Sequence, residues 1–391
     1  MSPMVTGMGV VTIGMMVANA ANYLLHVPAS RWLGPAAYSE FASLLSVQVM
    51  LSVPQMALQA VVAREAVRGA STHRMRALGL RCAVLVGLSG LVGVPVIASL
   101  LHVSIAASAA GLLAAPFLVL LGGEQGLLQG YRRFRELAFL FGISGVVRVA
   151  PAAAVLGFGG SPAWALGAAS VATAVLALAA RWLSRDPRPT RPRGDRVEPG
   201  VFAVLQASQV QLAMIALASV DLLVARAVLP GDQAGLYALG AVVTKIAFWL
   251  PAPVSVVFYP QMSHPEQSVR AVRTTLLVLA GIGALNVVVA FVAAPLVPLI
   301  VGDAYAPIEG VLWAFALNGA FLAVLQGALF ASIAAEYTWL AGIAWIALIA
   351  EFVLLTTIAD TVGQFIAVAA ISAAVAATLA SALTLRLTSS A

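Results

Sequence analysis

Charged residues are scarce in this sequence. Only 9% of the 391 residues are Asp, Glu, Lys or Arg, and 62% are hydrophobic, whereas a soluble domain has about 25% charged and about 45 to 50% apolar residues. This composition excludes a soluble globular protein. If a membrane span takes about 20 apolar residues, the hydrophobic fraction fills about twelve spans. The remainder is too short for a soluble catalytic domain, a nucleotide-binding cassette or a sensor module.

Residues that bind metals or perform catalysis are also few. Cys82 is the only cysteine, so no intrachain disulfide or thiolate metal site can form. The histidines, His26, His73, His102 and His264, have no spacing that would hold a metal on one helix face. No paired acidic cluster, P-loop or Ser/His/Asp set stands out. The sequence therefore predicts no cofactor, no metal and no enzymatic activity.

Long continuous apolar runs predict an all-α integral membrane protein with about twelve transmembrane helices. The runs lie at 5–28, 37–62, 78–101, 105–129, 135–158, 162–183, 201–226, 234–259, 272–300, 306–333, 338–358 and 362–385.

The positive charge predicts the orientation of these helices. The formal net charge is +6, and in a membrane protein such charge reports topology, so we expect no nucleic-acid partner. Arginines gather in the connections after the second, fourth, sixth and eighth spans: Arg64, Arg68, Arg74, Arg76, Arg81, Arg132, Arg133, Arg135, Arg185, Arg188, Arg191, Arg193, Arg196, Arg270 and Arg273. By the positive-inside rule, both termini are cytoplasmic in a multi-pass protein of the inner cell membrane.

The long polar segment 185–199, rich in Pro and Arg, lies near the midpoint of the chain. It predicts a cytoplasmic linker between two lobes of six helices, 1–184 and 200–391, although its arginines would also suit anionic lipids. An offset of about 197 residues aligns four glycine pairs, where about 1.4 are expected by chance. Two halves of six spans enter from the same side, so the repeat would be parallel. The aligned pairs are Gly34 with Gly231, Gly122 with Gly319, Gly130 with Gly327, and Gly145 with Gly342.

Charged groups inside spans are the main candidates for a functional site, because each costs about 2.5 to 3.5 kcal/mol to insert. Lys245, the only lysine, lies about 16 Å into its span, near the midplane. It either lines a polar cavity or forms a structural pair, for instance with Glu351. Arg148, Asp221 and Arg226 lie in outward halves of spans, where an Arg148–Asp221 bridge would close the outer face.

Further polar groups lie in the first, second and fourth spans. Glu124 is near the cytoplasmic end of the fourth span, and we expect it to pair with Arg132 or Arg133. The amides of Asn22, Gln55 and Gln59 fit either interhelical hydrogen bonds or contact with a substrate.

Several short stretches resemble Wzx-type polysaccharide flippases, of the superfamily of multidrug, oligosaccharidyl-lipid and polysaccharide exporters. The resemblance rests on Ala21–Leu25, Ala29–Tyr38, Phe41-Ala42, Leu51–Pro54, Leu127–Phe134 and Ala234–Ala238.

This resemblance implies a MATE-like fold, in which two lobes open alternately to the two sides of the membrane. The implied substrate is an isoprenoid-diphosphate-linked oligosaccharide, moved to the outer leaflet for the synthesis of cell-surface polysaccharide such as lipopolysaccharide. In the similar lipid II flippases, basic residues on the first and eighth helices line a cationic cavity. Ser30-Arg31-x-Leu33-Gly34 matches the first-helix pattern, and Lys245 supplies the eighth-helix charge. Membrane lipids, a polysaccharide polymerase and glycosyltransferases are the implied partners.

The predicted site therefore has two sets of residues. The first would bind substrate: Lys245, Arg31, Arg148, Asn22, Gln55 and Gln59. The second would gate the protein or couple it to Na⁺ or H⁺: Asp221, Arg226, Glu351 and Glu124. One alternative is a MATE-like drug/cation antiporter, which should show acidic groups without a midplane cation. Another is an integral-membrane glycan polymerase or prenyl transferase, which would need a large external loop or acidic metal-binding loops.

Overall fold

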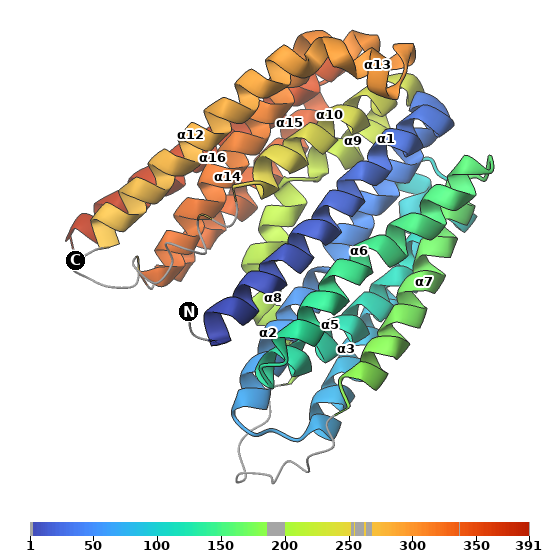
Figure 1. Ribbon diagram of the computed structural model, residues 1–391. Coiled ribbons are helices and arrows are strands. Elements are labelled where there is room, and N and C mark those ends of the chain that lie inside the picture. Colours follow the sequence, from blue (N-terminus) through green and yellow to red (C-terminus); the bar gives the residue numbers. More distant parts are fainter. Residues whose placement is uncertain are drawn as a thin grey trace. The chain divides into compact units, whose positions relative to one another are not determined.

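The computed structural model describes residues 3–185, 200–251, 254, 262, 268–335 and 337–390. Within these ranges the chain is helical and contains no β-strand (Figure 1), which confirms the predicted all-α class. Contacts divide the described residues into two compact units. An amino-terminal unit draws on Met1–Leu33 and Glu40–Leu212, and a carboxy-terminal unit on Gly34–Ser39 and Ala213–Ala391. The predicted linker 185–199 lies almost wholly outside the described residues, so the predicted lobe boundaries stay a prediction.

From α3 onward, the helices of the first half follow the predicted apolar runs closely. They are α1 (Pro3–Leu51), α2 (Val53–Val67), α3 (Thr72–Leu100), α4 (Ile105–Leu112), α5 (Ala114–Gly130), α6 (Phe134–Gly157) and α7 (Pro162–Leu183). Serine caps fix two of the starts: Ser71 accepts a hydrogen bond from the Arg74 amide, and Ser104 from the Ala107 amide.

The helices of the second half include more interruptions. They are α8 (Val201–Leu217), α9 (Val220–Val228), α10 (Gly231–Trp249), α12 (Ser268–Ala293), α13 (Val297–Val301), α14 (Leu312–Ala334), α15 (Gly342–Ile358) and α16 (Val362–Ser390), with 3₁₀ turns at Ala294–Leu296, Asp303–Val311 and Thr338–Ala341.

By length and composition, nine helices of the described part can cross a membrane, and the bent pair α8–α9 makes a tenth. The first of the nine, Gly14–Val67, contains two predicted spans, and α10 covers the first part of the remaining one, up to Trp249. The expected loop between the first two spans is instead a kink at Gly34, whose φ is +70°. Glycine adopts this left-handed conformation without strain, and Pro35 then suits the first position of the next helical segment.

Each unit repeats the same order of helix packing, as a parallel repeat requires. In the amino-terminal unit α5 packs against α2, α3 and α7, and in the carboxy-terminal unit α14 packs against α10, α12 and α16. Gly122 of α5 sits against the Gln55 carbonyl of α2, and Gly319 of α14 sits against Ala247 of α10. A Cβ at Gly122 would lie 2.5 Å from that carbonyl oxygen, so each of the two aligned glycines allows a neighbouring helix to approach closely.

Candidate functional site

Asp221 is the centre of a buried polar cluster in the carboxy-terminal unit. It lies in the first turn of α9, directly after the 43° bend that separates α8 from α9, and its exposed fraction is 1%. Its Oδ2 accepts a 2.7 Å hydrogen bond from the Tyr237 hydroxyl of α10, and its Oδ1 accepts the Leu222 amide at 2.8 Å. The Tyr237 ring is held edge-on by Phe315 and Phe365, with centroids 5.0 and 5.7 Å away.

Two further charged residues belong to this cluster. Lys245 lies eight residues after Tyr237 on α10 and interacts electrostatically with Asp221. Glu351 of α15 interacts electrostatically with Asp221 and Tyr237. Its side chain is 2% exposed, and its Oε1 has no hydrogen-bond partner among the described residues. Asp221 thus interacts electrostatically with Lys245 and with Glu351.

The charges of this cluster do not balance when all of its groups are ionised. Two carboxylates face one ammonium, and a buried net charge is costly unless it is neutralised. A proton or a monovalent cation at the unpartnered Glu351 oxygen would restore neutrality. Among the described residues, no group of three or more His, Cys, Asp or Glu side chains could hold a metal ion.

Arg226 lies in the last turn of α9, one turn beyond Asp221. Its Nη1 donates to Ser39 Oγ at 2.7 Å, and Ser39 is fully buried in the short segment that follows the Gly34 kink. In the same segment, Tyr38 meets Tyr305 edge-on at 6.2 Å. Arg226 thus attaches α9 to residues 34–39, a contact that suits its predicted gating role.

Arg148 lies midway along α6 in the amino-terminal unit. Its Nη2 donates to Gln48 Oε1 at 2.7 Å, and Gln48 Nε2 donates to the Gly111 carbonyl of α4 at 3.1 Å. Arg148 and Asp221, which the sequence suggested as a bridge, belong to different units, and each has its hydrogen-bond partner within its own. Nearby on α1, the Asn22 amide donates to the Ala18 carbonyl at 2.9 Å.

The glutamines of α2 contact glutamines of α5. Gln55 donates to Gln125 at 3.2 Å, and Gln59 donates to Gln129 at 3.0 Å. These bonds favour the interhelical alternative for Gln55 and Gln59. Arg31, by contrast, is exposed three residues before the kink at Gly34.

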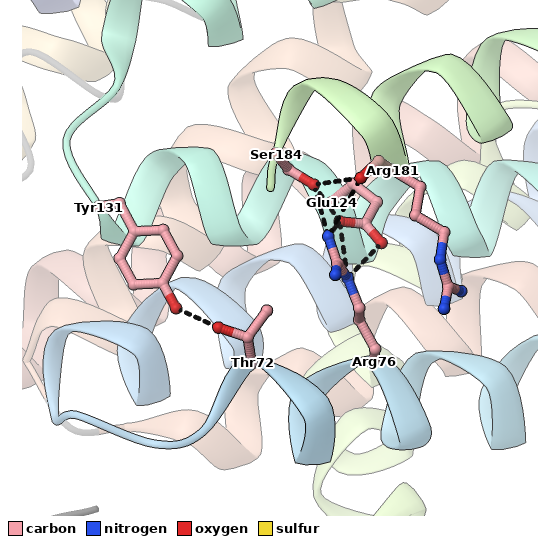
Figure 2. Close-up of polar contacts among 6 residues, drawn as sticks. All are labelled: Thr72, Arg76, Glu124, Tyr131, Arg181 and Ser184. Atoms are coloured by element: carbon pink, nitrogen blue, oxygen red, sulfur yellow. Dashed lines mark hydrogen bonds and ion pairs between the residues drawn. The ribbon is translucent and has the colours of Figure 1, made fainter. Parts of the chain in front are cut away.

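Glu124 belongs to a polar cluster that joins α3, α5 and the end of α7 (Figure 2). Arg76 Nε contacts Glu124 Oε1 at 3.0 Å, and Arg76 Nη2 also donates to Ser184 Oγ at 3.0 Å. The Ser184 hydroxyl in turn donates to the Glu124 carboxylate.

The expected pairing of Glu124 with Arg132 or Arg133 is wrong. Eight residues of helix span about 12 Å, so Arg132 lies too far along the chain, and Arg133 pairs with Glu136 at 3.0 Å. Sequence reasoning also missed Tyr131, whose hydroxyl meets the Thr72 hydroxyl at 2.7 Å and fastens the end of α5 to the start of α3 (Figure 2).

Comparison with solved structures identifies the fold. An inward-facing multidrug resistance MATE family transporter of the MOP superfamily aligns with a TM-score of 0.72 at 14% identity, over 98% of each chain. An outward-facing structure from the same family gives a TM-score of 0.62 at 14% identity, over 98% of this chain and 96% of that one.

A third match is a MOP superfamily transporter from Pyrococcus furiosus, described as having a binding pocket of reverse polarity that suggests a different function. Its TM-score is 0.56 at 14% identity, over 98% of this chain and 95% of that one. No protein-family model and no curated protein sequence matches the chain. The chain therefore has the two-lobe helical fold of MATE transporters, and the narrower resemblance to Wzx-type flippases is not confirmed by these comparisons.

Proposed function

We propose that this protein is a multi-pass transporter of the cell membrane that works by alternating access. The fold supports this proposal, because solved structures with the same fold include both an inward-facing and an outward-facing transporter. We further propose that its substrate is an isoprenoid-diphosphate-linked oligosaccharide, carried from the inner to the outer leaflet. Glycosyltransferases would supply this substrate, and a polysaccharide polymerase would consume it.

Arg148, inside the amino-terminal unit, is the residue that favours an anionic substrate. Arg148 is bound by a neutral amide and contacts no carboxylate among the described residues, so its positive charge stays uncompensated. A diphosphate offers such a guanidinium charge-assisted hydrogen bonds. With the cytoplasm negative, outward movement of two negative charges gains about 4.6 kcal/mol per 100 mV.

The Asp221–Glu351 cluster is the proposed place of ion coupling. Uptake of one proton or one Na⁺ by these buried carboxyls would cancel their excess negative charge. Release of that cation would restore the charge and so favour a different arrangement of α9 and α10, which Asp221 and Tyr237 connect. Orientation follows the arginine-rich connections, which we place in the cytoplasm together with both termini.

A drug/cation antiporter is the second candidate, and the same acidic cluster favours it. The antiporter predicted from sequence lacks a midplane cation, whereas here Lys245 interacts with Asp221. Deletion of the gene separates the two candidates. If the protein is a flippase, lipid-linked oligosaccharide accumulates in the inner leaflet of deleted cells. If it is an antiporter, the deleted cells retain cationic dyes, and their lipid-linked oligosaccharide is unchanged.

A further inference from the structure

Arg148 is a charged group without a countercharge, about 21 Å along α6 from Phe134 and about 14 Å from its end at Gly157. A guanidinium carries five N–H donors, and one of its nitrogens donates to Gln48. In the described ranges, no Asp or Glu contacts it. An arginine inside a membrane span normally pairs with an acidic group or faces a water-filled cavity, so this arrangement requires an explanation.

Gln48 fixes the direction of the guanidinium without neutralising it. Its side chain is 2% exposed, and its NH₂ group donates to the Gly111 carbonyl. A carbonyl accepts but cannot donate, so the amide oxygen of Gln48 must face Arg148. Glutamate has the same shape as glutamine, but at this position it would cancel the charge of Arg148 and would turn an oxygen toward the Gly111 carbonyl. Glutamine is thus the residue that orients Arg148 while leaving its charge available.

Asn22 lies at the same level as Arg148. Gly142 packs on Gly14 and Gly145 packs on Ala18, so α1 and α6 run in the same direction side by side. Asn22 comes four residues after Ala18, and Arg148 comes three residues after Gly145, a difference of about 1.5 Å along the helices. Both side chains are partly exposed, so neither is fully enclosed by the packing of the helices.

We propose that Arg148, positioned by Gln48, binds an oxyanion of the phosphate class, and that Gln48 determines this preference by keeping the site cationic. The anion is either the diphosphate of a lipid headgroup or a free phosphate or pyrophosphate. The lipid form of the proposal rests on the proposed function, whereas binding of an anion does not. Gln48 acts through Arg148 and is therefore a positioning residue.

The test compares Gln48→Glu with the wild type in purified full-length protein. The unfolding temperature is measured with sodium pyrophosphate and compared with NaCl of equal ionic strength. It is also measured in lipid nanodiscs with and without polyprenyl diphosphate. We expect at least one diphosphate to stabilise the wild type. Gln48→Glu should weaken the apparent affinity of the protein for that diphosphate about tenfold or more. The glutamate would compete for Arg148, and hydrogen bonds between charged groups are stronger than neutral ones. Gln209→Glu, an exposed substitution in the same unit, adds the same negative charge and should leave the affinity unchanged.

The two diphosphates identify the source of the anion. Stabilisation by both indicates recognition of the phosphate itself, and stabilisation by the lipid alone indicates a headgroup site. If Gln48 only holds the Arg148 side chain in place, glutamate would hold it at least as firmly. Gln48→Glu would then bind the diphosphate as the wild type does. Wild-type affinity in Gln48→Glu overturns the proposal, as does the absence of stabilisation by either diphosphate.

Two substitutions of Arg148 keep the test decisive if Gln48→Glu does not fold. Arg148→Gln should remove the stabilisation, while Arg148→Lys should retain part of it because the charge remains. Equal stabilisation of both variants would contradict the proposal. If diphosphate binding depends on Arg148 but no lipid-linked glycan is transported, the anion site stands and the proposed transport function fails.

Discussion

The Lys245–Asp221 interaction offers a test of whether Lys245 serves the substrate or only the fold. Removing one member of a buried ion pair in direct contact costs about 3 to 5 kcal/mol, because the other charge stays buried. Lys245 interacts with Asp221 electrostatically and is half-buried, and in Lys245→Ala the Asp221 carboxylate keeps the Tyr237 hydroxyl and the Leu222 amide as donors. We therefore expect a smaller loss, about 2 kcal/mol.

The double variant Lys245→Ala/Asp221→Asn removes both charges. An asparagine at 221 can still hydrogen-bond to Tyr237 and to the Leu222 amide. About half of the lost stability should therefore return, leaving a deficit of about 1 kcal/mol. The free energy of unfolding is compared in detergent for the two single variants and the double variant, which forms a double-mutant cycle.

Transport by the same variants then separates the two roles of Lys245. If Lys245 interacts with an anionic substrate, the double variant is stable but does not export glycan, whereas Asp221→Asn alone, which keeps Lys245, still moves glycan down its gradient. Arg270→Ala, at an exposed position outside the cluster, should export normally. Wild-type export by the double variant would refute the reasoning, because Lys245 would then only neutralise Asp221.

Three further predictions concern single positions. Glu351→Gln should make transport independent of an imposed pH or Na⁺ gradient while transport down a substrate gradient continues; unchanged coupling in gradient-loaded vesicles would contradict this. Gly126→Leu should destabilise the protein by about 3 kcal/mol or more, because a Cβ at Gly126 would already lie 2.6 Å from the Gln59 carbonyl oxygen. Gly281→Leu, at a position with open space, is the matched control, and thermal unfolding compares the two variants. Arg76→Ala should cost about 3 kcal/mol or more by leaving Glu124 buried without its cation; the variant Arg76→Ala/Glu124→Gln should recover much of this, and equal instability of both would count against a buried ion pair.

The sequence predicted the helices well, because the length of an apolar run directly reflects the thickness of the membrane. The breaks were harder to predict. Gly34 and Pro35 are the residues expected at a sharp kink, yet the apolar pattern alone suggested a loop there. The bend between α8 and α9 falls at Ala218 and Ser219, where no glycine or proline indicates a break in the helix.

The site was predicted as a set of residues but not as a set of contacts. Burial of a charge in a span is visible in the sequence, and that is how Lys245, Asp221, Arg148 and Glu351 were selected. Their partners depend on which helix faces are adjacent. Arg148 meets Gln48 across 100 residues of chain, and Arg76 meets Glu124 across 48. A single sequence carries no pattern for such distances, so neither pair was predicted.

Movement of a lipid-linked glycan by the purified protein tests the central claim most directly. The protein is reconstituted into vesicles that carry a polyprenyl-diphosphate oligosaccharide, and the glycan that reaches the opposite leaflet is measured with a membrane-impermeant glycosidase. We predict that the wild type exposes the glycan to the enzyme and that an equal amount of folded Lys245→Ala does not. Exposure at the same rate in protein-free vesicles, or export of a cationic dye in place of the glycan, would contradict the account.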